Sequence, residues 1–196
     1  GGDWMPYARL MVPIAPSLVY ASVLASAHAA PMATASRSVL ALAAGIWLVV
    51  RGGTSGRSVG ADRAALVAVA RPVLRGARRV ASLDVGWVGA ATEADILDLG
   101  GVTDPVVAAL PGGQTSKRVG VMFLLGREPD VLLLYLPNGL PSGGLGAWQD
   151  AAFSRAVEAR LARSEVIARH FAPAAWLALG NRGGGYVVLR MRATAR

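Results

Sequence analysis

The stretch that decides the fold class is the run VLLLYL at Val131–Leu136, which is unbroken by any polar residue and follows Asp130. Strands buried on both faces of a sheet carry this continuous apolar pattern, whereas strands with one face in water alternate. The run therefore predicts a central strand. Shorter strands are predicted before it at Val80–Val85 and Asp95–Leu99, and an alternating strand after it at Tyr186–Arg192.

Helical patterns lie between these predicted strands. One helix is predicted to start at Pro105, with Thr103 or Asp104 as its N-cap, because Pro suits the first helical turn and short polar side chains suit the cap. A longer helix is predicted within Ala147–Arg169. Gly86–Gly89 is predicted as a tight turn or a further strand. Strands and helices thus alternate, which is typical of a small α/β domain.

Residues 1–50 have a different composition. No Asp, Glu, Lys or Arg lies between Arg9 and Arg37, and a helix needs about 20 apolar residues to span a bilayer. This pattern predicts a membrane hairpin with spans at about 8–28 and 32–50. The expected fold is therefore two transmembrane α-helices followed by a small α/β domain.

Residues 51–79 are predicted to join these two parts. A glycine-rich stretch up to Gly60 favours a flexible link, and Ala61–Ala77 has apolar residues at helical spacing with arginines elsewhere around the helix. The expected organisation is a membrane hairpin at 1–50, a linker and amphipathic helix at 51–79, and a soluble α/β domain at 80–196.

The chain is strongly basic, with a formal net charge of +8, and all but one of its 20 basic residues are arginine. Aromatic residues that could stack on bases are not interleaved with the arginines, so nucleic acid is not an expected partner. A basic cluster next to the predicted spans suits anionic lipid headgroups instead. That cluster comprises Arg51, Arg57, Arg63, Arg71, Arg75, Arg78 and Arg79.

Four stretches together resemble a known superfamily. They are GGDWM at Gly1–Met5, DVGWVG at Asp84–Gly89, DILDLGGVTDP at Asp95–Pro105 and PDV at Pro129–Val131. Together they resemble the C-terminal region of bacterial multi-spanning glycosyltransferases of the GT-C superfamily, which includes arabinofuranosyl- and mannosyltransferase-like proteins. The more specific part of the pattern covers residues 80–137.

The resemblance implies a fragment of an enzyme that transfers a sugar from a polyprenyl-phosphate donor to a cell envelope glycan or lipid acceptor. It implies that the soluble domain lies on the extracytoplasmic side of the bacterial inner membrane. This placement opposes the positive-inside rule, which would keep the arginine-rich residues 51–79 in the cytoplasm. The family's catalytic carboxylate is expected upstream of Gly1, so the catalytic residues are unknown, and the need for a divalent metal stays open.

Five residues are candidates for substrate binding. Asp3 is expected to orient a sugar hydroxyl or a metal-bound phosphate, or else to cap a helix beside Trp4 in an interfacial aromatic belt. Arg9 is expected to pair with a lipid phosphate or to act as an ordinary interfacial anchor. Asp84 and Trp87 are expected to form a platform for a saccharide, or a structural turn with a core Trp.

Other polar residues are expected to be structural. Asp98 is predicted as a turn partner, Asp104 as a helix cap, and Asp130 as a residue that supports its strand. His28 and His170 have no neighbouring metal ligands in the sequence, so no metal site is predicted. Two further hypotheses remain: a non-catalytic, membrane-anchored domain that binds glycan or protein, and an inactive paralogue of the transferase architecture.

Overall fold

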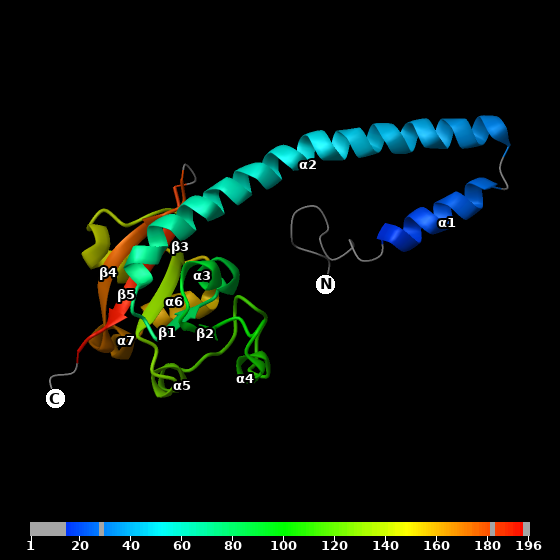
Figure 1. Cartoon of the computed structure of the whole chain (residues 1–196). Helices are drawn as coiled ribbons and strands as arrows, with labels where there is room; N and C mark the ends of the chain where they lie inside the picture. The colour runs from blue at the N-terminus through cyan, green and yellow to red at the C-terminus, as the bar shows by residue number, and fades with distance from the viewer. Residues whose placement is uncertain (1–14, 28–29, 181–182, 194–196) are drawn as a thin grey trace. The chain divides into compact units, whose positions relative to one another are not determined.

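The computed structural model describes residues 15–27, 30–180 and 183–193 (Figure 1). The chain divides into two compact units, Gly1–Gly60 and Ala61–Arg196. Within the described part of the chain, all the β-strands belong to the second unit, where they form one five-stranded sheet. This sheet organises the core of an α/β fold.

The prediction of transmembrane helices at about 8–28 and 32–50 is wrong. Among the residues that the structure describes, no helix combines the length and the apolar character needed to cross a bilayer. Helix α1 (Ala15–Ala27) has 13 residues, and residues 8–14 and 28 of the first predicted span lie outside the described residues. Helix α2 (Pro31–Leu74) has 44 residues, but its sequence is not continuously apolar.

The second apolar run is part of a longer helix. Within α2 it lies between Arg37 and Arg51, and the helix then continues through a segment rich in glycine and arginine. The stretch 51–60, expected to be a flexible link, is part of the same helix.

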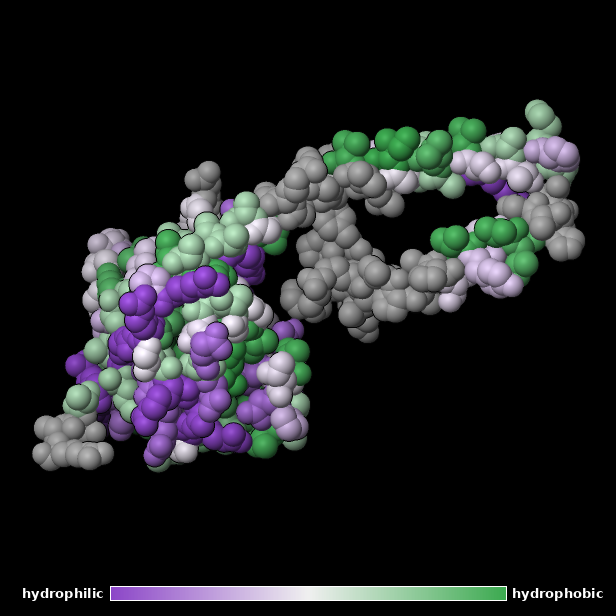
Figure 2. All heavy atoms as spheres, viewed as in Figure 1, coloured by the Kyte–Doolittle hydropathy of each residue, from purple (hydrophilic) through white to green (hydrophobic). Residues whose placement is uncertain are grey.

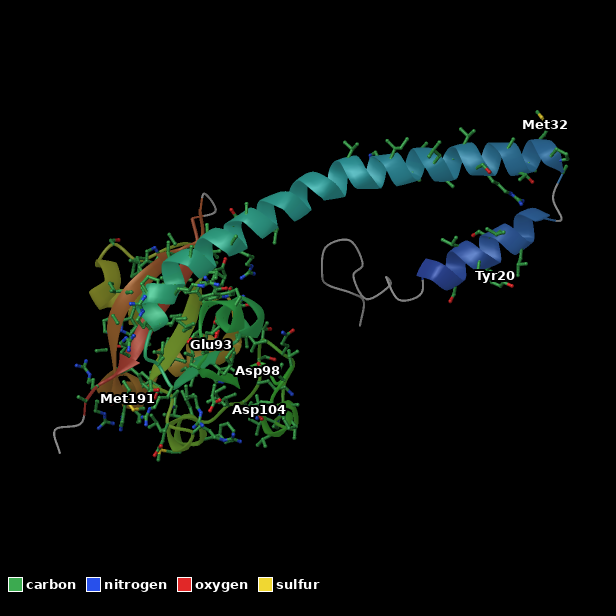
Figure 3. All side chains as sticks on the ribbon, viewed as in Figure 1. Tyr20, Met32, Glu93, Asp98, Asp104 and Met191 are labelled. Atoms are coloured by element: carbon green, nitrogen blue, oxygen red, sulfur yellow. The ribbon has the colours of Figure 1, made fainter. Side chains whose placement is uncertain are left out.

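Both helices of the first unit expose apolar side chains where the structure describes them. Tyr20 on α1 is 67% exposed and Met32 at the start of α2 is 84% exposed, and both project from their helices in Figure 3. Figure 2 shows hydrophobic residues along these helices. They include Val19, Val23, Leu24, Val39, Leu40, Leu42, Ile46, Trp47 and Val50.

The sheet of the second unit has the strand order β2-β1-β3-β5-β4. Its strands are β1 (Arg79–Ser82), β2 (Asp95–Asp98), β3 (Val131–Leu136), β4 (Phe171–Ala178) and β5 (Gly185–Met191). Strands β2, β1 and β3 run parallel, while β5 is antiparallel to both β3 and β4. The predicted central strand is confirmed, since every residue of β3 except Tyr135 is buried.

Helices cover both faces of the sheet. The second half of α2 and α3 (Val85–Ala91) pack on one face, where Leu66 and Trp87 meet Leu133. The other face is covered by elements whose side chains share a second apolar cluster with Leu132 and Leu134. These elements are α4 (Pro105–Ala108), α5 (Val121–Gly126), the 3-10 helix η2 (Gly144–Asp150), α6 (Ala156–Ala162) and α7 (Glu165–His170).

Several local elements differ from their predictions. Gly86–Gly89 is neither turn nor strand but part of α3. The helix expected within Ala147–Arg169 is divided: α6 ends with Arg163 as its C-cap, and Ser164 caps α7 by accepting a hydrogen bond from the Ile167 amide. Strand β4 was not predicted. It tolerates Pro173 because it lies at the edge of the sheet, where a missing amide donor is acceptable.

The turn after β2 is held by a buried carboxylate. Asp98 is fully buried and accepts hydrogen bonds from the amides of Gly100 at 2.8 Å and Thr103 at 2.6 Å. Between them, Gly101 has φ +71°, and a Cβ there would lie 2.5 Å from the Ala108 amide nitrogen. The turn therefore needs glycine both for its left-handed backbone and for its close approach to α4.

We predict that Gly101→Ala lowers the free energy of unfolding by at least about 2 kcal/mol, because it adds backbone strain and a steric clash. Urea denaturation of the full chain measures the change. Gly126→Ala is the matched control, since a Cβ at Gly126 meets no atom within 4 Å. Equal stability of the two variants would contradict this description of the turn.

Candidate functional site

The order of the parallel strands creates a crevice at their carboxyl ends. Strand β1 has β2 on one side and β3 on the other, so the chain leaves β1 in one direction through α3 and returns across it to form β3. In open α/β sheets, ligands bind at the carboxyl ends of strands where the connections diverge in this way. Asp84 follows β1 at this edge, and Tyr135 and Leu136 end β3 there.

Asp84 lies where the chain turns from β1 into α3. Its amide donates a hydrogen bond to the buried Ser82 hydroxyl at 3.1 Å, which fixes the turn. Asp84 occupies the N-cap position of α3, yet its side chain makes no capping hydrogen bond. Aspartate is among the preferred N-cap residues because its carboxylate can accept hydrogen bonds from the first helical amides. Here the carboxylate binds other partners instead.

Those partners are Arg155 and Tyr186. Arg155 Nη1 donates to Asp84 Oδ2 at 2.5 Å, and Tyr186 Oη donates to the same oxygen at 2.7 Å. Arg155 is the N-cap residue of α6, and Tyr186 lies on β5. One carboxylate oxygen thus joins the end of β1 to elements that come much later in the chain.

Glu158 extends this cluster into the core. It is 1% exposed, and its Oε1 accepts hydrogen bonds from the Tyr135 amide at 3.1 Å and from Arg155 Nη1 at 3.4 Å. Its Oε2 is buried and has no hydrogen-bond partner among the described residues. The crevice between β1 and β3 is therefore filled by an Asp–Arg–Glu cluster, here called the ionic cluster (Asp84, Arg155 and Glu158).

Aromatic rings pack against the ionic cluster. Arg155 Cζ lies 4.7 Å from the centroid of the Tyr135 ring, close enough for a cation–π contact. The Tyr186 ring lies 5.3 Å from Tyr135 and 4.8 Å from Trp87, measured between centroids. Trp87 is 5% exposed, and its indole nitrogen has no hydrogen-bond partner among the described residues. The ionic cluster is therefore flanked by aromatic rings on one side.

Burial and charge shift the pKa values of the cluster. Burial raises the pKa of Glu158 to about 7, although Arg155 and the Tyr135 amide partly oppose it. Burial lowers the pKa of Arg155, but the hydrogen bond to Asp84 and the charges of Glu158 and Asp84 outweigh it, so the net pKa is raised. The pKa of Tyr186 is also raised, by burial and then by Asp84.

A hollow of about 560 Å³ lies beside the ionic cluster, between α2 and α3. Its size falls in the range of roughly 300 to 1,000 Å³ that is usual for small-molecule sites. Asp84 reaches it with its side chain 22% exposed, and its Oδ1 accepts no hydrogen bond from other described residues. This space is here called the Asp84 hollow. It is lined by Arg63, Ala64, Val67, Asp84, Gly86, Trp87 and Ala90.

The structure brings together two of the five predicted binding residues. Asp84 and Trp87 both line the Asp84 hollow. Asp3, Trp4 and Arg9 lie outside the described residues. Trp87 is largely buried against Tyr186, so it forms part of a wall and does not offer an open ring face.

Three residues of the site were not predicted from the sequence. Arg155, Glu158 and Tyr186 belong to no recognisable motif, and Arg155 and Tyr186 are 71 and 102 positions from Asp84. The sequence gives one indirect indication of these residues. An aspartate in a largely apolar strand end must find a partner when it is buried, which predicts that a cation exists but not which one.

The other carboxylates have structural roles, as expected. Asp98 holds a turn, and Asp104 caps α4 by accepting hydrogen bonds from the amides of Val106 and Val107. Asp130 accepts from the Arg78 and Arg79 amides. Burial raises the pKa of Asp130, but these amides and the Arg78 guanidinium more than offset it, and the pKa is lowered. The part of the chain that the structure describes has no group of three or more His, Cys, Asp or Glu residues suited to a metal.

Comparisons with known proteins give no match to this chain, whether against protein-family models, curated proteins or solved structures.

We predict that Glu158 makes the protein less stable as the pH rises. Its pKa is about 7 in the folded chain against an ordinary value of 4.5, so between these values the folded state binds more protons than the unfolded state. Stability from the neutral carboxyl is therefore present below pH 4.5 and is lost as the pH rises through 7. Wild type should lose about 2 kcal/mol relative to Glu158→Gln between pH 5 and pH 8.

Urea denaturation of both proteins at these two pH values measures the difference. Glutamine is a suitable replacement because its amide oxygen can still accept from the Tyr135 amide and Arg155. Glu165→Gln is the control, since Glu165 belongs to the first turn of α7 and not to the ionic cluster. A pH dependence that is identical in wild type and Glu158→Gln would refute the assignment.

Proposed function

We propose that the α/β unit binds a saccharide in the Asp84 hollow, and that it serves a glycosyltransferase of the type that the sequence resembles, which takes its sugar from a polyprenyl-phosphate donor. The observation that carries this proposal is the open carboxylate oxygen of Asp84 beside apolar walls. Saccharides present hydroxyl groups on their rims and C–H groups on their faces. In the Asp84 hollow, Asp84 Oδ1 can accept a hydrogen bond from a hydroxyl group, and the apolar walls can pack against the C–H face.

The chemistry of the lining residues supports a polyhydroxylated ligand. Asp84 Oδ1 can accept hydrogen bonds from ligand hydroxyls, and Arg63 can donate to ligand oxygens. Ala64, Val67 and Trp87 supply the apolar surface against which a sugar face can pack. Small-molecule sites have this composition, with mostly apolar walls and a few convergent polar groups.

The ionic cluster supports the same role by holding Asp84 still. Its Oδ2 is fixed by both Arg155 and Tyr186, so little side-chain entropy remains to be lost when Oδ1 accepts a ligand hydroxyl. Preorganisation of this kind favours weak polar ligands such as sugars. It is a positioning device, and Arg155 and Tyr186 need not touch the ligand.

The geometry supports binding and not the transfer step itself. Glu158 has the raised pKa expected of a general acid or base, but it is 1% exposed and does not line the Asp84 hollow. Asp84 already shares one oxygen with two donors. The proposal therefore assigns the transfer step to residues outside the Asp84 hollow.

The resemblance adds a second line of support. Its stretch Asp84–Gly89 forms most of α3, and three of these residues line the Asp84 hollow. Its other described stretches, Asp95–Pro105 and Pro129–Val131, build β2, the following turn and the start of β3. The residues on which the resemblance rests are thus divided between the hollow and the framework that supports it.

We predict that filling the hollow abolishes saccharide binding without unfolding the protein. Ala64→Phe places a ring among the lining residues, whereas Ala65→Phe, the matched control, places it at an exposed neighbouring position of the same helix outside the hollow. Calorimetric titration of the full chain with short mannose and arabinofuranose oligosaccharides measures binding. Wild type and Ala65→Phe should bind at least one of them, and Ala64→Phe should bind none.

Two outcomes would count against the proposal. Either no oligosaccharide binds to wild type, or Ala64→Phe binds as well as Ala65→Phe does. Circular dichroism and a urea titration on each variant separate loss of the hollow from loss of the fold.

A further inference from the structure

A second hollow adjoins the Asp84 hollow on the same face of the sheet. It has a volume of about 630 Å³ and is lined mainly by residues from the end of α2 and from the segment after α3. Ala90 lines both hollows, which therefore meet at α3. The lining of this second space, here called the arginine hollow, comprises Arg71, Arg75, Gly76, Ala77, Arg78, Ala90, Ala91, Thr92, Glu93, Ala94 and Asp95.

Residues of α2 connect the two hollows along one side. Arg63, Val67 and Arg71 are four positions apart, so they lie on the same face of the helix. At 1.5 Å per residue, Arg63 and Arg71 are about 12 Å apart along the axis. Arg71 Nη2 donates to the Ala90 carbonyl at 3.3 Å, which places its guanidinium where the hollows meet. A ligand that occupied both hollows would be elongated.

The arginine hollow has cationic groups that other residues do not neutralise. Arg75 makes no hydrogen bond or ion pair with any other residue that the structure describes. Arg71 uses one of its five donors on the Ala90 carbonyl. Arg78 pairs with Asp130 at 3.3 Å but keeps 86% of its side chain exposed.

Two acids line the same space. Asp95 pairs with Arg79 at 3.3 Å, so its charge is offset by a residue outside the lining. Glu93, labelled in Figure 3, follows α3 and is exposed. Against this one uncompensated carboxylate stand Arg71 and Arg75, so the positive charge dominates.

We infer that the ligand of the Asp84 hollow is an acidic saccharide, whose anionic substituent is bound in the arginine hollow by Arg71 and Arg75. This inference rests on the proposed function. The guanidinium fork pairs with phosphate and carboxylate through parallel hydrogen bonds, so either group meets the same requirement. The Asp84 hollow is lined by one carboxylate and one guanidinium, those of Asp84 and Arg63, whereas the arginine hollow has an excess of guanidinium groups. The anionic part of the ligand is therefore placed in the arginine hollow, and the neutral part beside Asp84.

The test compares three oligosaccharides of the same length and backbone: neutral, bearing a terminal phosphate, and bearing a terminal uronate. The full chain is titrated with each by calorimetry at low and high salt. An acidic ligand should bind about fivefold more tightly than the neutral one at low salt, and salt should reduce this advantage by screening. Whichever acidic ligand binds more tightly identifies the anion.

Arg75→Gln should remove the advantage of the acidic ligand while leaving binding of the neutral one unchanged, since Arg75 has no hydrogen-bond or ion-pair partner among the described residues. Arg118→Gln is the matched control, because Arg118 is exposed and lies outside both hollows. Arg71→Gln should have the same effect as Arg75→Gln.

Failure of the inference can be told from failure of the proposed function. If all three oligosaccharides bind equally and Arg75→Gln changes nothing, the inference is overturned and saccharide binding at Asp84 stands. If inorganic phosphate alone binds as tightly as the phosphorylated ligand, the arginine hollow is an independent anion site and the inference is again overturned. If no oligosaccharide binds at all, both proposals fail.

Discussion

The second unit depends on one shared carboxylate oxygen. Asp84 Oδ2 accepts hydrogen bonds from Arg155 and Tyr186, and so connects β1, α6 and β5 at the carboxyl edge of the sheet. A partly buried arginine without a partner is costly, and removal of one member of such a pair destabilises a protein strongly. Glu158 extends the network into the core through Oε1, which accepts hydrogen bonds from Arg155 and the Tyr135 amide. Its Oε2 has no hydrogen-bond partner among the described residues. The position of Asp84, and with it the floor of the hollow, follows from this network.

The network also explains why the crevice between β1 and β3 is not itself the proposed binding space. In comparable sheets a ligand lies at this edge, but here Arg155 and Glu158 fill it. The open space is displaced to the α2–α3 face, where Asp84 offers its remaining oxygen. Arg155 and Tyr186 thus hold Asp84 in place through Oδ2, and Asp84 Oδ1 stays accessible to a ligand. This division is consistent with a binding role for the unit.

Much of the sheet could be predicted because its signals are local. The apolar run of β3, the Asp104–Pro105 helix start and the strand β5 are each readable from a few neighbouring residues. The alternation expected for β5 is wrong, because its first five residues are all buried. Helix α3 was missed because Gly86 and Gly89 have low helix propensity; what favours the helix is the burial of Trp87, Val88 and Ala91 against the sheet, which is tertiary.

The remaining errors have two physical origins. The membrane prediction relied on the absence of charge between Arg9 and Arg37, whereas no helix among the described residues is both long and apolar enough to cross a bilayer. The site was half predicted. Asp84 and Trp87 are neighbours in sequence, but Arg155 and Tyr186 reach Asp84 only through the folded sheet. No single-sequence pattern encodes such distant pairs.

The most direct test of the central claim is a nuclear magnetic resonance titration of the isotope-labelled full chain with a neutral mannose or arabinofuranose oligosaccharide. We expect concentration-dependent shifts of the Trp87 indole signal and of the Gly86 and Ala90 amides, which line the Asp84 hollow. Resonances of α5 and α7, on the opposite face of the sheet, should stay unchanged. An absence of shifts at the hollow at millimolar ligand, or shifts confined to other surfaces, would contradict saccharide binding at Asp84.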